Sequence, residues 1–532
     1  MLNTTIATRG MAVAPHSLAA QAALSVLSKD GGNAIEAMVA AAAAIAVVYP
    51  HMNGIGGDGF WVISEPDRPV VAVQGCGVAG AWVSRDLYLE HKLGSIPTRG
   101  PLAANTLAGT VGGWQQALDI SAQWRGKLPL SRLLEDAIHY AEQGIPVTLS
   151  QHASTAAKLN ELLHQPGFAD TFLVDGQAPA TGSRFTQARM GQTLRALAAQ
   201  GLDSFYRGDL AKLIATDLAE VGSPITLQDL NNYHASTGQP VHLKHSLGDI
   251  YNSAPPTQGM VSLIILAILD RLNLGRYQED SLEYVHLVVE ATKQAFLIRD
   301  RYVGDPDCMT IDPQACLTDD FLLPHVNAIR LDQALPWGQG KGPGDTVWMG
   351  VIDSEGRAVS FIQSIYHEFG SGVVLPRTGI NWQNRGCSFS LDPAHLNALR
   401  PGKKPFHTLN PALARFHDGR TMVYGTMGGD GQPQTQAAVF SRYAVFNQSV
   451  QQAITAPRWL LGRTWGDSSE SLKLESRFSP EIINGLRALG HDVAVIGAFD
   501  EMVGHAGAIV RNPDGIFEGG FDPRSNGIVA GF

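Results

Sequence analysis

Residues 337–365 read WGQGKGPGDTVWMGVIDSEGRAVSFIQSI, and within this stretch the chain changes from a glycine-rich tract to strand-forming sequence. Four glycines, a proline and a lysine lead directly into Asp345 and Thr346. Two runs rich in β-branched and aromatic residues then flank Ser-Glu-Gly, which predicts a β-hairpin whose first strand begins at Thr346. A surface loop or a linker does not by itself explain why so flexible a tract ends abruptly at a threonine.

Thr346 also separates two kinds of sequence. Residues 105–300 are mostly helical in pattern, and apolar residues every three or four positions predict a long amphipathic helix over 281–302. Beyond the hairpin, ALARFHDGRTMVYGT and HAGAIVRNPDGIFEGG predict further strands. We therefore expect a functional boundary between segments 1–345 and 346–532.

Composition indicates an ordinary globular protein with a large core. Hydrophobic residues make up 44% of the 532 positions and charged residues 17%. The net charge of −10 argues against nucleic acid or an anionic membrane as a partner. The N-terminus lacks a basic segment followed by an apolar core, and the most apolar run, before Pro50, is too short to cross a bilayer. We expect a soluble cytoplasmic protein.

A cofactor motif occurs in the wrong setting. Gly54, Gly56 and Gly59 match GxGxxG, but this pattern binds a dinucleotide only where a strand precedes it and a helix follows. Here an alanine-rich helix is predicted before it and a strand after it, so we interpret it as a helix-to-strand turn. His367-Glu368 lacks the second histidine of a zinc helix. We expect neither a metal nor an organic cofactor.

A backbone cut between Asp345 and Thr346 would explain the glycine-rich tract. Thr346 would then carry both a hydroxyl nucleophile and an α-amine, whose usual pKa of about 7.7–8 allows it to act as general base. The flexible tract would let the scissile peptide reach a strained geometry, and the strand would hold the nucleophile. The alternative is a non-enzymatic two-domain protein in which 337–345 is only a linker.

From Thr346 onward the sequence resembles the small subunit of the γ-glutamyltransferase family of self-processing N-terminal-nucleophile hydrolases. The matching motifs there are FGSGVVLPRTGINWQNRG, KPFHTLNPAL, GTMGGDGQPQ, TAPRW and FDPRSNGIVAGF, and in the first part HMNGIGGDGFW, PLAANTLAGTVGGW and SAPPTQGM resemble the large subunit. The resemblance implies an α+β fold, a four-layer αββα sandwich. It also implies a precursor cleaved into segments 1–345 and 346–532, which remain together as an α–β heterodimer, with a dimer of heterodimers as a further option.

The resemblance also implies roles for particular residues. Thr346 is the nucleophile and Asp345 supplies the scissile carbonyl. Gly428 and Gly429 match a pair whose backbone N–H groups form an oxyanion hole. Ser364 matches a hydroxyl residue that assists the nucleophile.

Several positions depart from the γ-glutamyl pattern. Cys76 stands where an arginine grips the substrate α-carboxylate, and Cys387 and Ser388 stand where acidic residues grip its α-amine. His407 and Thr408 replace a pair of serines. A site that leaves the charges of a zwitterion unmatched binds it poorly, so these residues disfavour γ-glutamyl substrates.

Arg385 offers a different carboxylate clamp. It follows Asn384 in the NRG segment of the matched substrate loop, and a guanidinium binds a carboxylate bidentately. Tyr366, His407 and Thr408 are expected to line the same pocket. With GGDGQPQ, the NRG segment resembles the family's amidohydrolase branch, which implies hydrolysis of a small carboxylate-bearing amide, oxamate, to oxalate and ammonia. The alternatives are a γ-glutamyltransferase or glutathione hydrolase, and a cephalosporin-type acylase with a roomier pocket.

Overall fold

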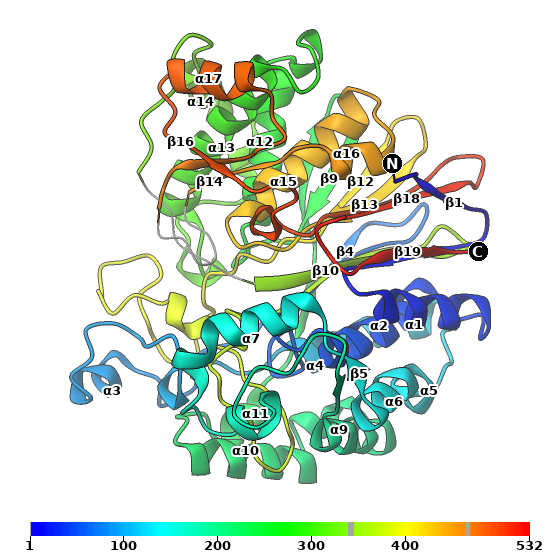
Figure 1. The fold of residues 1–532 in the computed structure, drawn as a ribbon, viewed down its shortest axis with the longest axis vertical. Coiled ribbons are helices and arrows are strands. Elements are labelled where there is room, and N and C mark those ends of the chain that lie inside the picture. Colours follow the sequence, from blue (N-terminus) through cyan, green and yellow to red (C-terminus); the bar gives the residue numbers. More distant parts are fainter. Residues whose placement is uncertain (1, 339–344, 463–468) are drawn as a thin grey trace.

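The computed structural model of the chain describes residues 2–338, 345–462 and 469–532. Two seven-stranded antiparallel sheets face each other, and helices cover the outer face of each (Figure 1). We call them the β10 sheet and the β13 sheet after their central strands.

The strands of both sheets come from distant parts of the chain. In spatial order the β10 sheet contains β19 (Ile528–Gly531), β2 (Met11–Ala14), β10 (Asp345–Ile352), β11 (Ala358–Tyr366), β3 (Asp58–Ser64), β4 (Val71–Gly75) and β7 (Ser236–Gly238). The β13 sheet contains β1 (Thr5–Ala7), β18 (Phe517–Phe521), β17 (Gly507–Arg511), β13 (Thr421–Gly425), β12 (Ala412–Phe416), β9 (Gly248–Asn252) and β8 (Val241–His245). The hairpin predicted from the sequence is β10 and β11.

Helices from different halves of the chain cover the two sheets. The β10 sheet is covered by α1 (Ser17–Ser28), α2 (Ala34–Val48) and α4 (Thr110–Gln123), and the β13 sheet by α12 (Gly259–Arg271), α13 (Leu282–Tyr302), α15 (Gly431–Phe440) and α16 (Val450–Thr455). The four layers confirm the predicted αββα sandwich. The helix expected at 281–302 is present, but the amphipathic prediction was wrong, because every residue from 284 to 296 is buried beneath outer elements such as α17.

The remaining elements lie around this sandwich. The outer helices are α3 (Arg85–Glu90), α5 (Leu130–Leu133), α6 (Glu135–Gln143), α7 (Leu149–Leu162), α8 (Phe168–Phe172), α9 (Ala188–Gln200), α10 (Asp209–Val221), α11 (Leu227–Asn232), α14 (Asp319–Ala328) and α17 (Pro480–Ala488). Two small sheets pair β5 (Ile145–Pro146) with β6 (Arg184–Phe185), and β15 (Leu472–Glu475) with β14 (Trp459–Leu461) and β16 (Val493–Ile496).

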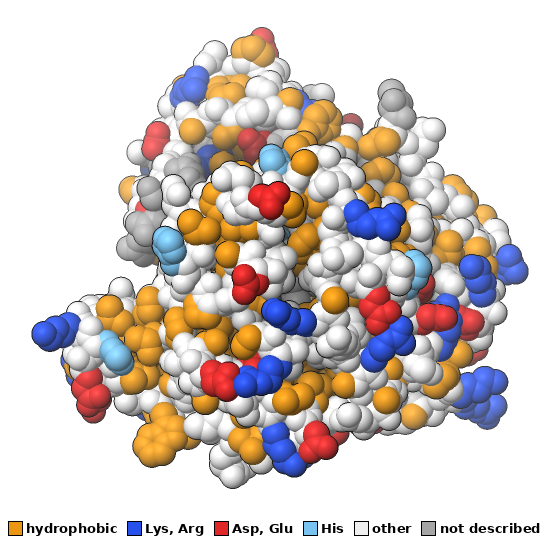
Figure 2. Space-filling model, turned by 60° about the horizontal axis from the view of Figure 1, so that its bottom comes forward, with side chains coloured by type: hydrophobic (Ala, Val, Ile, Leu, Met, Phe, Trp, Pro, Cys, Tyr) orange, Lys and Arg blue, Asp and Glu red, His pale blue; other side chains and the backbone are white. Residues whose placement is uncertain are grey.

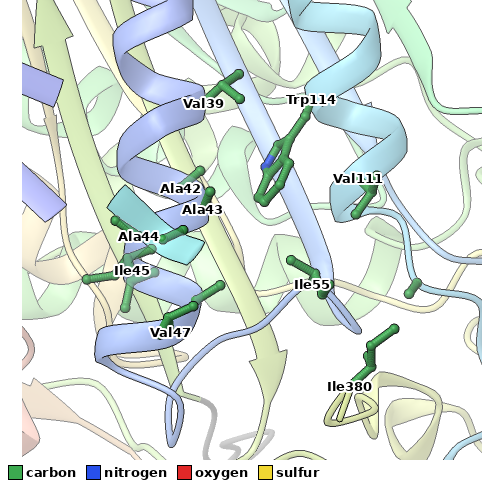
Figure 3. Packing of buried hydrophobic residues seen from close by; sticks show 14 of the residues in the cluster. Val39, Ala42, Ala43, Ala44, Ile45, Val47, Ile55, Val111, Trp114 and Ile380 are labelled. Carbon is green, nitrogen blue, oxygen red and sulfur yellow. The ribbon is translucent and has the colours of Figure 1, made fainter. Parts of the chain in front are cut away.

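Three hydrophobic cores separate the four layers. Every residue of α2 is buried, and its run of small alanines allows α1, α4 and the β10 sheet to approach closely. Figure 3 shows Trp114 of α4 pointing toward the side chains of α2. Between the two sheets, larger side chains such as Phe60 and Trp348 fill the interior. Burial on both faces explains why β10 and β11 read as nearly continuous apolar runs.

The segments before and after Thr346 share both sheets. Strand β2, from the first segment, pairs with β10 on one side and with β19 on the other, and both of these belong to the second segment. Strand β11 pairs in turn with β3 of the first segment. A cut at 345/346 would therefore leave two chains, neither of which could complete a sheet alone.

The GxGxxG segment is the predicted helix-to-strand turn, between α2 and β3. A Cβ at Gly56 would lie 2.2 Å from the Asn381 carbonyl oxygen, and one at Gly57 would lie 2.1 Å from that of Ser364. These glycines therefore allow the turn to pack against backbone close to Thr346.

The surface charges and the character of the helices are relevant to two partners that the sequence argued against, nucleic acid and a membrane. On the face shown in Figure 2, basic and acidic side chains are interspersed, and no single basic patch covers it. Among the described residues, no helix combines the length and apolar character that crossing a bilayer needs.

Trp348 of β10 is the largest side chain joining the two sheets, and its indole N–H donates to Ser360 Oγ at 2.9 Å. Gly350, Gly425 and Gly507 make room for it, because a Cβ at any of them would lie 2.3–2.8 Å from an indole carbon.

Replacing this indole should destabilise the whole sandwich. We expect Trp348→Ala to lower the free energy of unfolding by about 3–5 kcal/mol, because it leaves a cavity between the sheets. Chemical denaturation measures this change. Trp82→Ala is the matched control, since that side chain is 72% exposed and its loss should change stability by less than about 0.5 kcal/mol. Equal effects of the two substitutions would contradict this account of the core.

Candidate active site

Thr346 is the second residue of β10 and is fully buried. The strand begins at Asp345, one residue earlier than the sequence indicated. Residues 339–344 of the glycine-rich tract lie outside the described residues, so the role expected for them stays a prediction.

An irregularity in the hairpin places Ser364 opposite Thr346. Asp345 pairs with Tyr366 and Val347 pairs with Gln363, so two residues of β11, Ser364 and Ile365, face the single residue Thr346. This is a β-bulge, a feature that re-aims side chains beside active sites. Ser364 Oγ accepts the Tyr366 backbone N–H at 2.8 Å.

Tyr366 itself has a φ of +82°, which is uncommon for a bulky residue and costs conformational energy. The surrounding contacts hold it there, and its ring lies beneath Arg385.

Gly428 and Gly429 lie in the loop between β13 and α15, with φ values of +111° and +53°. Their carbonyl oxygens accept the N–H groups of Gly431 and Gln432. Neither glycine N–H donates to another residue in the described part of the chain. Both donors are thus available at the start of α15, where the helix dipole also favours negative charge.

Gln432 connects this loop to Thr346. It is the second residue of α15, and its Nε2 donates to Thr346 Oγ1 at 3.5 Å. Sequence reasoning missed Gln432, although it lies inside the GGDGQPQ motif that carried the resemblance.

Hydrogen bonds and an ion pair also hold the loop that carries Gly428 and Gly429. Gln258 Nε2 donates to the carbonyl oxygens of Gly429, at 2.8 Å, and Thr408, at 2.9 Å. Arg299 of α13 donates to Asp430 Oδ1 at 2.9 Å. Gln258 and Arg299 were also missed, because their partners are distant in sequence and only the fold brings them together.

Arg385 begins a short 3-10 turn, Arg385–Ser388, and its side chain is almost completely buried. Its Nη1 donates to Thr408 Oγ1 at 3.5 Å, and its Cζ lies 3.7 Å from the centre of the Tyr366 ring. Among the described residues, its Nε and Nη2 have no hydrogen-bond partner. Burial lowers the pKa of this guanidinium. A desolvated cation with two free donors is suited to a bidentate carboxylate ligand.

His407 lies behind Arg385 and faces a buried carboxylate. Its Nε2 is 3.1 Å from Asp58 Oδ2, although the two groups are poorly aligned for a hydrogen bond. The other oxygen, Asp58 Oδ1, accepts the N–H groups of Gly77 and Gly109 and the side-chain amide of Gln383. Burial, and then the charge of Arg385, lowers the pKa of His407 to about 4. The imidazole is therefore neutral near pH 7.

Both ends of the Asn384 side chain form hydrogen bonds with backbone groups. Its Nδ2 donates to the Thr98 carbonyl oxygen at 2.8 Å, and its Oδ1 accepts the His367 N–H at 3.1 Å. These bonds hold the turn that presents Arg385. The substrate contact predicted for Asn384 stays a prediction.

Among the residues that the structure describes, two buried clusters contain potential metal ligands, and each has a fixed cation nearby. The clusters are Asp58, Cys76 and His407, and His286, Glu290 and His491. The charge of Arg385 acts on Cys76 and His407 in the first. In the second, Lys293 Nζ lies 2.7 Å from Glu290 Oε1. These positive charges oppose the binding of a metal ion at either place.

Two facing sheets covered by helices, with a buried hydroxyl residue at the start of an inner strand, define an N-terminal-nucleophile hydrolase fold. Its solved relatives have the same class of fold. The structure of cephalosporin acylase from Bacillus halodurans superposes with a TM-score of 0.91 at 33% identity, covering 100% of this chain and 97% of that one.

The chain belongs to the gamma-glutamyltranspeptidase family, whose model matches residues 19–532. It is 60% identical, over the full length of both proteins, to the oxamate amidohydrolase proenzyme of Klebsiella pneumoniae subsp. pneumoniae. It is 40% identical, again over both full lengths, to the glutathione hydrolase-like YwrD proenzyme of Bacillus subtilis.

The buried histidine makes stability depend on pH. Unfolded His407 takes up a proton near pH 6.5 whereas folded His407 does so near 4, so its neutral form stabilises the fold above 6.5 and this contribution is lost as pH falls toward 4. We expect His407→Gln to make the decline in unfolding free energy between pH 6.5 and 4 shallower by up to about 1.4 kcal/mol per pH unit. Urea denaturation across this range measures the slope. Thr408→Val, which removes no titrating group, should leave the slope as in the parent, and an unchanged slope in His407→Gln would refute the assignment.

Proposed function

We propose that this chain is a proenzyme that cleaves itself between Asp345 and Thr346 and then hydrolyses oxamate to oxalate and ammonia. The observation that carries the substrate is Arg385, a buried cation whose Nε and Nη2 find no acceptor among the described residues. The 60% identity to an oxamate amidohydrolase proenzyme supports the same substrate.

Self-cleavage uses the hydroxyl of Thr346. Oγ1 attacks the carbonyl carbon of Asp345, the C–N bond breaks, and the acyl group moves from nitrogen to oxygen. The shift frees the α-amine of Thr346, and water then hydrolyses the ester, which releases the carboxylate of Asp345 and regenerates the Thr346 hydroxyl. The products are chains of about 37 and 20 kDa from a precursor of 56.9 kDa. They remain associated as a heterodimer because β2 of one lies between β10 and β19 of the other.

Turnover repeats the attack on an external amide. The free α-amine takes the proton of Oγ1, and Oγ1 attacks the amide carbon of the substrate. The N–H groups of Gly428 and Gly429 stabilise the oxyanion, in the manner that usually contributes a few kcal/mol. The intermediate collapses as ammonia leaves with a proton, and water hydrolyses the acyl-enzyme. Ser364, opposite Thr346 across the bulge, assists the nucleophile.

The polar groups around the pocket favour a small acid over an amino acid. Arg385 holds the carboxylate of oxamate, and Tyr366 supports the guanidinium from below. His407 and Thr408 complete this wall. Cys387 and Ser388 offer no carboxylate to the ammonium group of a γ-glutamyl substrate, whose charge would be desolvated without compensation.

Removing the nucleophile tests self-cleavage. Thr346→Ala should leave a single band at the precursor mass on a denaturing gel, whereas the parent gives two, because alanine has no hydroxyl. Thr346→Ser retains a hydroxyl and should still be cleaved. A single band for the parent protein, or two bands for Thr346→Ala, would sink the proposal.

Removing the guanidinium tests the substrate. We expect Arg385→Ala to lower kcat/KM for oxamate by about 10²–10³-fold, as is usual when one partner of a buried charge pair is lost. Oxamide, which lacks the carboxylate, is the matched substrate and should lose far less. Ammonia release measures both reactions, and Arg330→Ala, at an exposed site, should have no effect. If the parent prefers a γ-glutamyl-anilide or a glutaryl-amide to oxamate, the alternative family activity is correct.

A further inference from the structure

Gln432 makes a direct contact with the proposed nucleophile. It lies fully buried in the first turn of α15, three residues after Gly429, and its Nε2 approaches Thr346 Oγ1 to 3.5 Å. The contact joins β10 to α15, two elements that are distant in sequence.

The other end of the Gln432 side chain has no partner. Its Oε1 is buried and accepts no hydrogen bond from any described residue. The next glutamine of the same helix is different: Gln434 donates to the carbonyl oxygens of Asp430 and Leu461, and its Oε1 accepts the Leu461 N–H at 2.8 Å. Burying a carboxamide oxygen without a donor costs free energy, so an unsatisfied one beside an active site calls for an explanation.

Self-cleavage supplies a donor that can turn toward this oxygen, because the amide N–H of Thr346, fixed in the peptide plane, becomes a freely rotating amine. When the Asp345–Thr346 bond breaks, Thr346 gains an α-amine two bonds away from the carbon that carries Oγ1. An N-terminal threonine then presents an acceptor and a donor side by side. The carboxamide of Gln432 presents the complementary pair, a donor at Nε2 and an acceptor at Oε1.

We propose that Gln432 is a further catalytic residue that positions both reacting groups of Thr346. Its Nε2 holds Oγ1 in the precursor and in the mature enzyme. Its Oε1 accepts one N–H of the new amine, which turns the nitrogen lone pair toward the proton of Oγ1. Gln432 itself neither gains nor loses a proton: the proton passes from Oγ1 to the amine, and the Nε2 donor stabilises the charge left on oxygen. The inference rests on the proposed function only in taking Thr346 as nucleophile.

The charged groups of the surrounding elements are already paired or fixed. Asp430, at the start of α15, is bound by Arg299 of α13. Arg385 stacks on Tyr366 of β11, and Asp58 of β3 faces His407. None of them is altered by substitution at position 432, so a change in the pH dependence can be assigned to the contact between Gln432 and the amine.

Two substitutions that replace Gln432 by a side chain of similar size should shift the protonation equilibrium of the Thr346 amine in opposite directions. Gln432→Glu places a carboxylate beside the amine, favours its protonated form, and should move the acid limb of the kcat/KM–pH profile up by about one unit or more. Gln432→Met removes the acceptor and should move the same limb down while lowering kcat. Both variants lose the Nε2 donor, so both should cleave themselves at least about tenfold more slowly, within the range known for positioned catalytic groups.

Gln434→Met is the matched control on the same helix. It breaks structural bonds and should lower the melting temperature, but it should leave the acid limb where it is in the parent. Precursor cleavage followed on gels, pH profiles of ammonia release and thermal unfolding are measured for all variants.

Opposite shifts of the acid limb support the inference, and so does a folded Gln432 variant that fails to cleave. Parent-like cleavage and profiles in both variants overturn it, as does lower activity that follows the melting temperature with the limb unmoved. A parent protein that cleaves but releases no ammonia from oxamate refutes the proposed substrate alone, because the cleavage rates still test Gln432.

Discussion

The pairing of β10 with β11 is the constraint on which the rest of the site depends. Its regular register holds two apolar strands in the middle of a sheet whose two faces are both buried, and it breaks at one place, where Ser364 and Ile365 face Thr346. Regular pairing on one side of the bulge gives Thr346 a rigid backbone. At the bulge, the polar residue Ser364 lies opposite Thr346 in an otherwise apolar interior. A nucleophile fixed in this way loses little freedom when it attacks.

The two sheets also explain how a cleavable chain keeps one structure. Both segments contribute strands to both sheets, so cutting the backbone removes no strand from its neighbours. The inter-sheet core around Trp348 joins β10 to β13, and the loop that follows β13 carries Gly428 and Gly429. Thr346 and the loop with Gly428 and Gly429 are therefore carried by opposite sheets and are held together by packing as well as by Gln432.

The electrostatics of the buried site around Arg385 follow from burial. Arg385 is desolvated over an aromatic ring, His407 is kept neutral, and Asp58 is occupied mainly by backbone N–H groups. Among the described residues, the site thus has one buried positive group, Arg385, without a counter-ion in contact, which suits a substrate with a single carboxylate. The structure also gives parts in the site to Asp58 and Gln258, which lie in the motifs HMNGIGGDGFW and SAPPTQGM but received no role from the sequence.

From the sequence, strand periodicity predicted the hairpin, because it is a property of neighbouring residues, while the family resemblance of the ordered motifs implied the four-layer architecture and the candidates Thr346, Gly428, Gly429 and Arg385. It did not reveal that the helix over 281–302 is buried nearly all round, since its polar residues Glu290 and Lys293 satisfy each other inside the protein. Gln432, Gln258 and Arg299 emerged only from the tertiary structure. Their partners lie 86, 171 and 131 residues away, and no local pattern records a contact that only the packing of distant elements creates.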